Sequence, residues 1–370
     1  VYWRRKSVGV DKNMNTAFFQ EGSRRFATAM AGIPDRVPVY AQMHEFVLRE
    51  LGADPRQFYT DPELLVRGTL EVMEAYGIDV PLLDYDVYNI EAEALGQAII
   101  YPHNGMPDVD RTRPLIQEKV DLEKIRTPDF EKDGRFPAVL EMNRLFCEMA
   151  GGLEGTPGFC APFSLAANIR GIEQLLMDIY LDPEFARELF DRVTDDVLIP
   201  WILKLKTVCP KAAGIGGSDA SASLPIVNLD ILREWVLPYV TRLQEKCGPE
   251  VYVPNWVGET CLKHPEEMLD LKMAACPGFI EGQDPDVEEL GPLFYKSFAL
   301  EKKVPLVLGI GAAFLALATP VEIRQRVREY IEIGGKGGGF ALYLCNLGAT
   351  TPPDNVRAAL QAVRDYGVYA

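Results

Sequence analysis

Short apolar runs alternate with longer amphipathic stretches along most of the chain. Eight runs have the length and composition of buried strands, and they lie at 37–43, 80–85, 158–163, 212–216, 251–257, 279–281, 304–308 and 340–344. The stretches between them, such as 62–76, 183–208 and 320–333, carry apolar residues at helical spacing. Strands that alternate with helices predict an α/β fold with a parallel sheet, and eight strands can close a (β/α)8 TIM barrel.

The pattern predicts a single domain over residues 14–370. No internal repeat or low-complexity linker divides it, and a helical stretch before the first strand forms an N-terminal extension. Residues 96–135, rich in Asp, Pro and Arg, interrupt the alternation and indicate an insertion near the barrel mouth. We expect this insertion to pair 97–101 with 112–116 in a hairpin. Residues 1–13 lack the apolar core of a secretory signal and are expected to be a leader or disordered extension.

Composition narrows the class of partner. A formal charge of −16 over 370 residues argues against nucleic acid and anionic membranes. No apolar stretch approaches the roughly 20 residues that span a bilayer. The seven cysteines are an odd number, contain no CxxC pair and are typical of a reducing cytoplasm.

Polar and aromatic residues follow the expected strand ends, where a β/α barrel carries its chemistry. The candidate acids are His44, Asp84, Asp219, Glu259 and Tyr343. Candidate substrate-binding residues are Phe46, Tyr85, Tyr88, Phe163, Asn255, Trp256, Gln283, Cys345 and Asn346. Each has a structural alternative, because loop carboxylates commonly cap helices and aromatic residues commonly fill cores.

The tail of the chain carries the most specific signal. A glycine cluster at 334–339 leads into the last apolar run, then Cys345-Asn346-Leu347-Gly348, a Pro-rich turn and a helix-patterned end. This tail resembles the closing strand and helix of the uroporphyrinogen decarboxylase superfamily. Further landmarks extend the resemblance over 24–366, at Arg24-Arg25-Phe26, Asp35-Arg36-Val37-Pro38-Val39, Asp182-Pro183-Glu184 and Val236-Leu237-Pro238-Tyr239.

Two departures from the superfamily's motifs indicate the branch. True uroporphyrinogen decarboxylases carry an Arg-rich loop after strand one, which grips substrate carboxylates, whereas this chain has Gln42-Met43-His44-Glu45-Phe46. Thiol-activating methyltransferases of the superfamily hold zinc with a His-x-Cys after strand five and a cysteine after strand eight. Here Asn255 and Val257 fill the first two positions and only Cys345 remains. One thiolate is too few for a zinc site, although a rebuilt site from Glu259, Cys261, His264 or Asp219 is an alternative.

The resemblance is nearest to the corrinoid-dependent methyltransferases, and segments 40–45, 90–96 and 281–286 are similar to the methyltransferase component of aryl methyl ether O-demethylases. It implies that a small methyl donor, a methoxyphenol, passes its methyl group to cob(I)alamin on a partner corrinoid protein. An acid that protonates the leaving oxygen would accelerate this step. Two alternatives stay open: a decarboxylase of a small carboxylic acid, for which Arg170 is the best cation at the mouth, and a non-catalytic corrinoid- or ligand-binding barrel.

Overall fold

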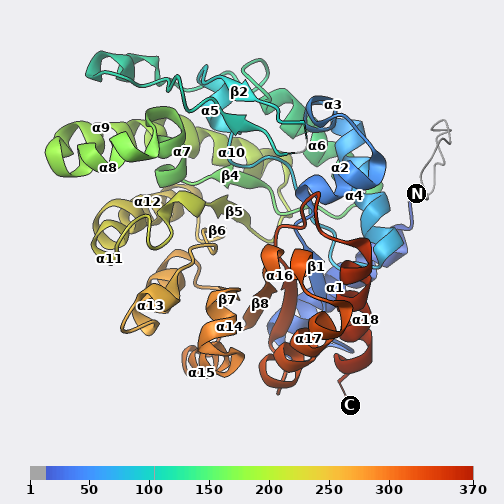
Figure 1. The fold of residues 1–370 in the computed structure, drawn as a ribbon. Helices are drawn as coiled ribbons and strands as arrows, with labels where there is room; N and C mark the ends of the chain where they lie inside the picture. Colours follow the sequence, from blue (N-terminus) through green and yellow to red (C-terminus); the bar gives the residue numbers. More distant parts are fainter. Residues whose placement is uncertain (1–13, 104, 370) are drawn as a thin grey trace.

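The computed structural model describes residues 14–103 and 105–369, and it places parallel strands at the centre of a layer of helices (Figure 1). The central strands are β1 Val39–Ala41, β4 Gly158–Cys160, β5 Ile215–Ser218, β6 Val251–Tyr252, β7 Ile280–Gln283, β8 Leu306–Ile310 and β9 Phe340–Leu344. They form two parallel sheets, ordered β1-β9-β8-β7 and β4-β5-β6. The prediction of an α/β fold is confirmed. The prediction for residues 1–13 lies outside the described residues.

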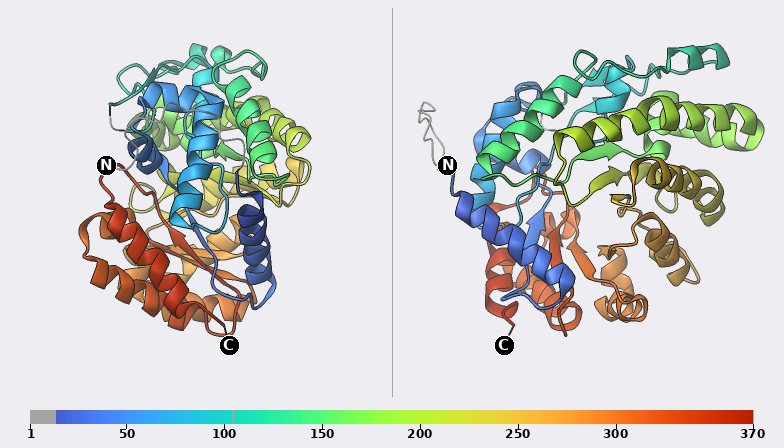
Figure 2. Two further views of the ribbon diagram at one scale, coloured as in Figure 1. Left: turned by 90° about the vertical axis from the view of Figure 1, so that its right-hand side faces the viewer. Right: turned by 180° about the vertical axis from the view of Figure 1, so that it is seen from behind.

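Helices lie outside the strands in every view (Figures 1 and 2). The main ones are α1 Thr16–Ala31, α2 His44–Leu51, α4 Pro62–Tyr76, α5 Ile90–Ala94, α6 Phe136–Met149, α7 Pro162–Arg170, α8 Ile172–Leu181, α9 Pro183–Arg192, α10 Ile199–Val208, α12 Leu237–Cys247, α13 Glu266–Ala275, α14 Asp286–Leu290, α15 Pro292–Lys302, α16 Ala312–Leu317, α17 Pro320–Gly334 and α18 Pro353–Tyr366. Several begin with a proline after a capping side chain; Asp61, Asp182 and Thr319 each accept a backbone N–H in the first turn. Across the described residues, every helix is too short or too polar to cross a membrane.

Residues 80–85 were expected to form the second strand, but they form no β-ladder with a neighbouring strand. Val80 donates its N–H to the carbonyl of Val39, 3.2 Å away, next to β1. The Tyr85 hydroxyl donates to the carbonyl of Gly158 at 2.7 Å and accepts from its N–H at 2.9 Å. This segment therefore connects β1 to β4. At the other junction, between β6 and β7, the rings of Tyr252 and Phe279 pack edge to face with their centroids 5.8 Å apart, so the eight predicted runs follow one another around a ring.

The insertion forms a hairpin, but with a different register from the one expected. β2 Ile99–Ile100 pairs antiparallel with β3 Asp108–Val109, so the predicted pairing of 97–101 with 112–116 is wrong. The reason is a turn after β3, where the Asp110 carboxylate accepts the N–H and hydroxyl of Thr112 at 3.1 and 2.5 Å. Within the insertion, Met106 donates its N–H to Oε1 of Glu45 in α2 at 3.1 Å, so the insertion lies beside the barrel mouth.

The strand register determines which side chains face the inside of the ring. Pairing between β7, β8, β9 and β1 places Gln283, Gly309, Tyr343 and Tyr40 on one row. Glycine fits in this row on β8 without displacing its neighbours, whereas a Cβ at Gly309 would lie 2.5 Å from Sγ of Cys345. Inward-facing residues of β8 and β9 pack together, apart from the main core formed by their outward-facing neighbours.

Water reaches part of the ring interior. In β1, inward-facing Tyr40 is partly accessible while both of its neighbours are buried. The same alternation holds in β5, where Gly216 and Ser218 are accessible and the outward-facing residues are buried. Inward-facing Tyr252 and Gln283 are also partly accessible. Since the outward residues are sealed by helices, this exposure indicates open space inside the ring.

Candidate functional site

A histidine and two polar partners meet at the carboxyl ends of β1, β9 and the 80–85 segment. Oδ2 of Asp84 accepts the N–H groups of Met43 and His44 at 2.9 and 3.3 Å, which anchors the first turn of α2. The same oxygen lies 3.4 Å from Nδ1 of His44, and the ring's Nε2 lies 3.1 Å from Oδ1 of Asn346. Asn346 follows β9 directly and has a φ of 47°, a left-handed conformation that asparagine tolerates better than most residues. Both ring nitrogens of His44 therefore face oxygen atoms.

Below this histidine, five inward-facing side chains form two hydrogen-bonded groups, which meet where the rings of two tyrosines stack. The rings of Tyr343 and Tyr40 stack with their centroids 4.6 Å apart, and the Tyr343 hydroxyl donates to Oε1 of Gln42. The Tyr40 hydroxyl donates to Oε2 of Glu281 at 3.2 Å, and Nε2 of Gln283 donates to the other carboxylate oxygen at 2.6 Å. Burial raises the pKa of the Glu281 carboxyl, because removal from water disfavours its charged form.

A second polar group lies at the ends of β5 and β6. Asp219 is fully buried, and its two oxygens accept the N–H of Ser164 at 2.9 Å and Nε1–H of Trp256 at 3.2 Å. Asn255 accepts the N–H of Asp219 at 3.0 Å and donates to the Tyr88 hydroxyl at 3.3 Å. Burial raises the pKa of Asp219 to about 6. Both of its oxygens have partners, so Asp219 is placed to hold Trp256 and the start of α7 in position.

Five other predicted site residues have structural contacts of their own. Glu259 is fully buried and paired with a lysine of α13 at 2.9 Å. Phe46 packs edge-on against a tyrosine of α4, and Phe163 packs against a phenylalanine of α9. Tyr85 connects the 80–85 segment to β4. Cys345 is buried beside Gly309, and its burial raises the pKa of its thiol well above the usual value.

The candidate residues did not include four that the structure places at or beside the interior. Tyr40, Gln42 and Glu281 lie on or directly after strands, where the inward direction of a side chain depends on strand register. The one signal in the sequence was the carboxylate of Glu281, which is unusual within a buried strand. Glu91 of α5 accepts the N–H of Cys160 at 3.1 Å, while its Oε2 is buried without a hydrogen-bond partner. Burial raises the pKa of Glu91 to about 8.

The side chains do not fit the zinc site of the thiol-activating relatives. Among residues 14–103 and 105–369, no three His, Cys, Asp or Glu side chains come together as metal ligands. Asp219 and Glu259 are held by separate partners, while Cys261 is exposed and His264 lies at the surface beside Glu266. The rebuilt zinc site is therefore not formed by these four residues.

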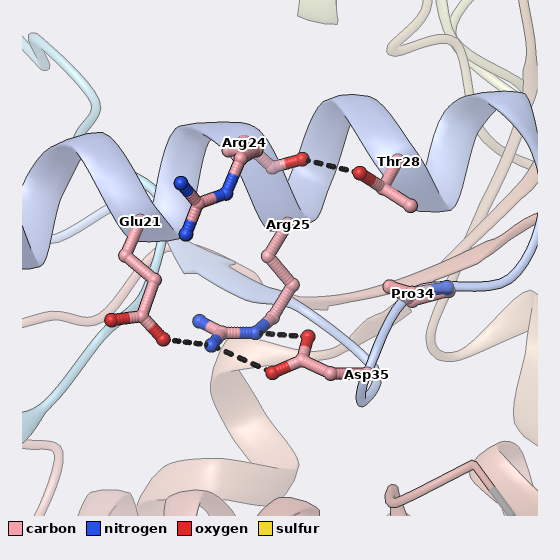
Figure 3. Close-up of a pocket in the computed structure, with 6 residues that line it drawn as sticks. All are labelled: Glu21, Arg24, Arg25, Thr28, Pro34 and Asp35. Carbon is pink, nitrogen blue, oxygen red and sulfur yellow. Dashed lines mark hydrogen bonds and ion pairs between the residues drawn. The ribbon is translucent and has the colours of Figure 1, made fainter.

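Two pockets lie away from the strand ends that carry the candidate residues. One, of about 310 Å³, lies between α1 and residues 34–35, before β1 (Figure 3). Arg25 there donates to Asp35 at 2.8 and 3.0 Å and to Glu21 at 2.5 Å. The other, of about 590 Å³, lies among α4, α17 and α18, outside the ring. Neither contains a predicted site residue.

Comparison with known proteins identifies several relatives. A model of the family described as uroporphyrinogen decarboxylase matches residues 22–366. A methylated-thiol–coenzyme M methyltransferase of Methanosarcina mazei is 25% identical over 353 residues, which is 92% of this chain and 88% of that protein. A uroporphyrinogen decarboxylase of Syntrophotalea carbinolica is 32% identical over 198 residues, 50% of this chain and 53% of its own. One from Anaeromyxobacter dehalogenans is 23% identical and covers 93% of this chain and 99% of its own.

A solved structure supports the fold. A methyltransferase from Methanosarcina mazei superposes with a TM-score of 0.75 at 21% identity, over 94% of this chain and 99% of that one. The superfamily resemblance inferred from the sequence is confirmed by the family match.

Proposed function

The chain belongs to the uroporphyrinogen decarboxylase family, and from this premise we propose that it is a methyltransferase that demethylates a small aryl methyl ether. The acceptor is cob(I)alamin carried by a corrinoid protein. Cobalt(I) supplies an electron pair to the methyl carbon, the carbon–oxygen bond breaks, and the phenolate oxygen keeps the bonding pair and takes up a proton. The proposal is supported by similarity to a methyltransferase over 92% of the chain.

The observation that carries the proposal is the orientation of His44. Because Nδ1 faces Asp84 and Nε2 faces Asn346, the doubly protonated imidazolium can donate from both nitrogens. The expelled phenolate has a conjugate acid of pKa about 10, so protonation makes it a much better leaving group. A positioned acid contributes roughly 10²–10⁴-fold to such a step. Asn346 is exposed, so its side-chain amide can move aside. The ether oxygen of the donor would then replace the amide oxygen as the hydrogen-bond partner of Nε2.

Thiol activation is not supported by the residues that follow β6. Asn255 stands where the thiol-activating relatives carry a histidine, and its amide is occupied by the backbone of Asp219 and the hydroxyl of Tyr88. Val257 stands where they carry a cysteine and has no ligand atom. An ether oxygen, which is activated by a proton rather than by a metal-bound thiolate, fits this chain better.

Decarboxylation of a small acid is supported less well. Arg170, the cation considered for that role, donates to both carboxylate oxygens of Asp178 at 2.6 and 3.1 Å. A third donation, at 3.1 Å, goes to the carbonyl of Ile116. The guanidinium is buried in these contacts and has no free face for a substrate carboxylate.

A methyl-transfer assay with matched histidine variants tests the proposal. The purified chain, a reduced corrinoid protein and a panel of methoxyphenols are mixed, and the cobalt absorption spectrum is followed. We expect transfer from at least one donor, and a loss of roughly 100-fold in kcat in His44→Gln with little change in KM. His264→Gln, at an exposed histidine, should keep the wild-type rate. Absence of transfer from every O-methyl donor refutes the proposal, and a wild-type rate in His44→Gln removes that residue from it.

A further inference from the structure

The loops at the carboxyl ends of the ring contain no lysine or arginine, and their one basic side chain, His44, faces the carboxylate of Asp84. The eight segments that follow the strand ends are 42–48, 84–92, 161–169, 219–231, 253–262, 284–291, 311–319 and 345–356, and none includes a lysine or arginine. The same segments carry twelve carboxylates, at Glu45, Asp84, Asp86, Glu91, Asp219, Asp230, Glu259, Asp284, Asp286, Glu288, Glu289 and Asp354. The central strands are also free of lysine and arginine.

Arginines just beyond these segments donate hydrogen bonds to backbone carbonyls or to carboxylates of the protein. Arg49 donates to two backbone carbonyls of the loop before α18, at 2.8 and 2.7 Å. Arg326 donates to Asp284 at 3.1 Å, and Arg135 donates to Asp86 at 2.6 Å. Together with the buried pairing of Arg170, these contacts direct the neighbouring guanidinium groups away from the ring interior.

Neutral hydrogen-bonding groups line the interior instead. Gln42 and Gln283 are partly accessible there, and each uses one end of its amide: Oε1 of Gln42 accepts from Tyr343, and Nε2 of Gln283 donates to Glu281. The amide N–H of Gln42 and the amide oxygen of Gln283 stay available for a ligand. An uncharged phenolic hydroxyl can accept a hydrogen bond from the amide N–H or donate one to the amide oxygen.

Resting on the proposed function, we propose that the methyl donor is an uncharged methoxyphenol, and that this barrel rejects methoxybenzoates, whose carboxylate would be unpaired inside. An anion that leaves water for a site with no lysine or arginine, where the one imidazole already faces a carboxylate, loses its hydration without compensation. The hydroxyl of a methoxyphenol meets neutral amides and tyrosines instead. Gln42 and Gln283 are the specificity-determining residues in this account.

Equilibrium binding of demethylated products separates this inference from the chemistry. Three ligands share a dihydroxyphenyl ring and differ only in charge: catechol, 3,4-dihydroxybenzoate and 3,4-dihydroxybenzylamine. Titration calorimetry with the whole chain needs neither cobalamin nor turnover. We expect catechol to bind at least about tenfold more tightly than the benzoate, equivalent to about 1.4 kcal/mol. We also expect catechol to bind more tightly than the benzylamine, because carboxylates at the strand ends such as Asp86, Glu259 and Asp284 already have basic partners.

An introduced cation provides the complementary test. In Gln42→Arg the guanidinium would lie among the inward-facing residues, so the affinity for the benzoate should rise about tenfold while that for catechol changes little. Gln42→Met is the matched control, because it also removes the acceptor of the Tyr343 hydroxyl but adds no charge. If Gln42→Arg does not fold, Ser218→Lys places a cation on the opposite wall, at the end of β5.

Each outcome bears on the inference. Equal or tighter binding of the benzoate by the wild-type chain overturns it, even if methyl transfer from another donor is found. Preference for the benzylamine overturns it in favour of a cationic donor. If none of the three ligands binds, the interior does not receive a phenol ring and the inference also fails. Preferential binding of catechol without methyl transfer from any donor would support the charge argument and refute the proposed function instead.

Discussion

Gly309→Ala adds one methyl group where three inward-facing side chains meet. The new carbon would lie 2.5 Å from Sγ of Cys345, 3.1 Å from Cγ of Gln283 and 3.1 Å from Cδ1 of Tyr343. Non-bonded carbon atoms in contact are normally about 3.5–4.0 Å apart, so these neighbours must retreat by roughly 0.5–1 Å. Overpacking of this kind lowers the free energy of unfolding by about 1–3 kcal/mol, which is the loss we expect.

A double-mutant cycle identifies the source of that loss. Urea unfolding is measured by tryptophan fluorescence for the wild type, Gly309→Ala, Cys345→Ala and the double variant. Since Cys345→Ala removes the nearest clashing atom, the double variant should recover about 1 kcal/mol or more relative to the sum of the single variants. Gly278→Ala is the control, because a Cβ there meets nothing within 4 Å. Additive losses, within about 0.5 kcal/mol, would refute this packing of the interior row.

Two further substitutions test the buried carboxylates near the site. Burial raises the pKa of Glu91 from 4.5 to about 8, so the stability associated with its neutral form is present at low pH and is lost as pH rises through the folded pKa. Glu91→Gln stays neutral at every pH. Its advantage over the wild type in free energy of unfolding, measured with a chemical denaturant, should therefore grow by about 2–3 kcal/mol between about pH 6 and pH 9. A difference that does not change with pH would contradict the raised pKa. Asp84→Asn should lower the methyl-transfer rate about tenfold or more, because the carboxylate that faces Nδ1 of His44 and accepts the N–H groups of Met43 and His44 is replaced by a neutral amide. A wild-type rate in this variant would count against that pairing.

The apolar pattern predicted strand positions well where a run is buried on both faces. β9 occupies the predicted 340–344, because its outward residues pack against helices and its inward residues pack against one another. The pattern was less informative at 80–85 and 251–257. The first run has no ladder of its own, and β6 ends after Tyr252, two residues before Pro254, which has no N–H to donate.

The expected strand ends predicted which residues lie near one another where the backbone alone determines proximity. His44 and Asn346 are 302 positions apart in the chain, yet they meet because parallel strands bring their carboxyl ends to one side. The direction of a side chain was harder to predict. Phe46 and Phe163 lie within the first turns of α2 and α7, where their packing partners belong to the outer helices. The inward direction of Tyr40 depends on the register between β1 and β9, which sequence periodicity does not reveal.

Transfer of a labelled methyl group distinguishes demethylation of an aryl ether from decarboxylation. A methoxyphenol carrying ¹³C in its methoxy group is incubated with the chain and a reduced corrinoid protein for a single turnover, and the products are followed by ¹³C NMR. We expect the label to move to cobalt while an equal amount of the demethylated phenol appears. Label that stays on oxygen, or that is released as carbon dioxide from a carboxyl-labelled acid in a parallel sample, would contradict this expectation.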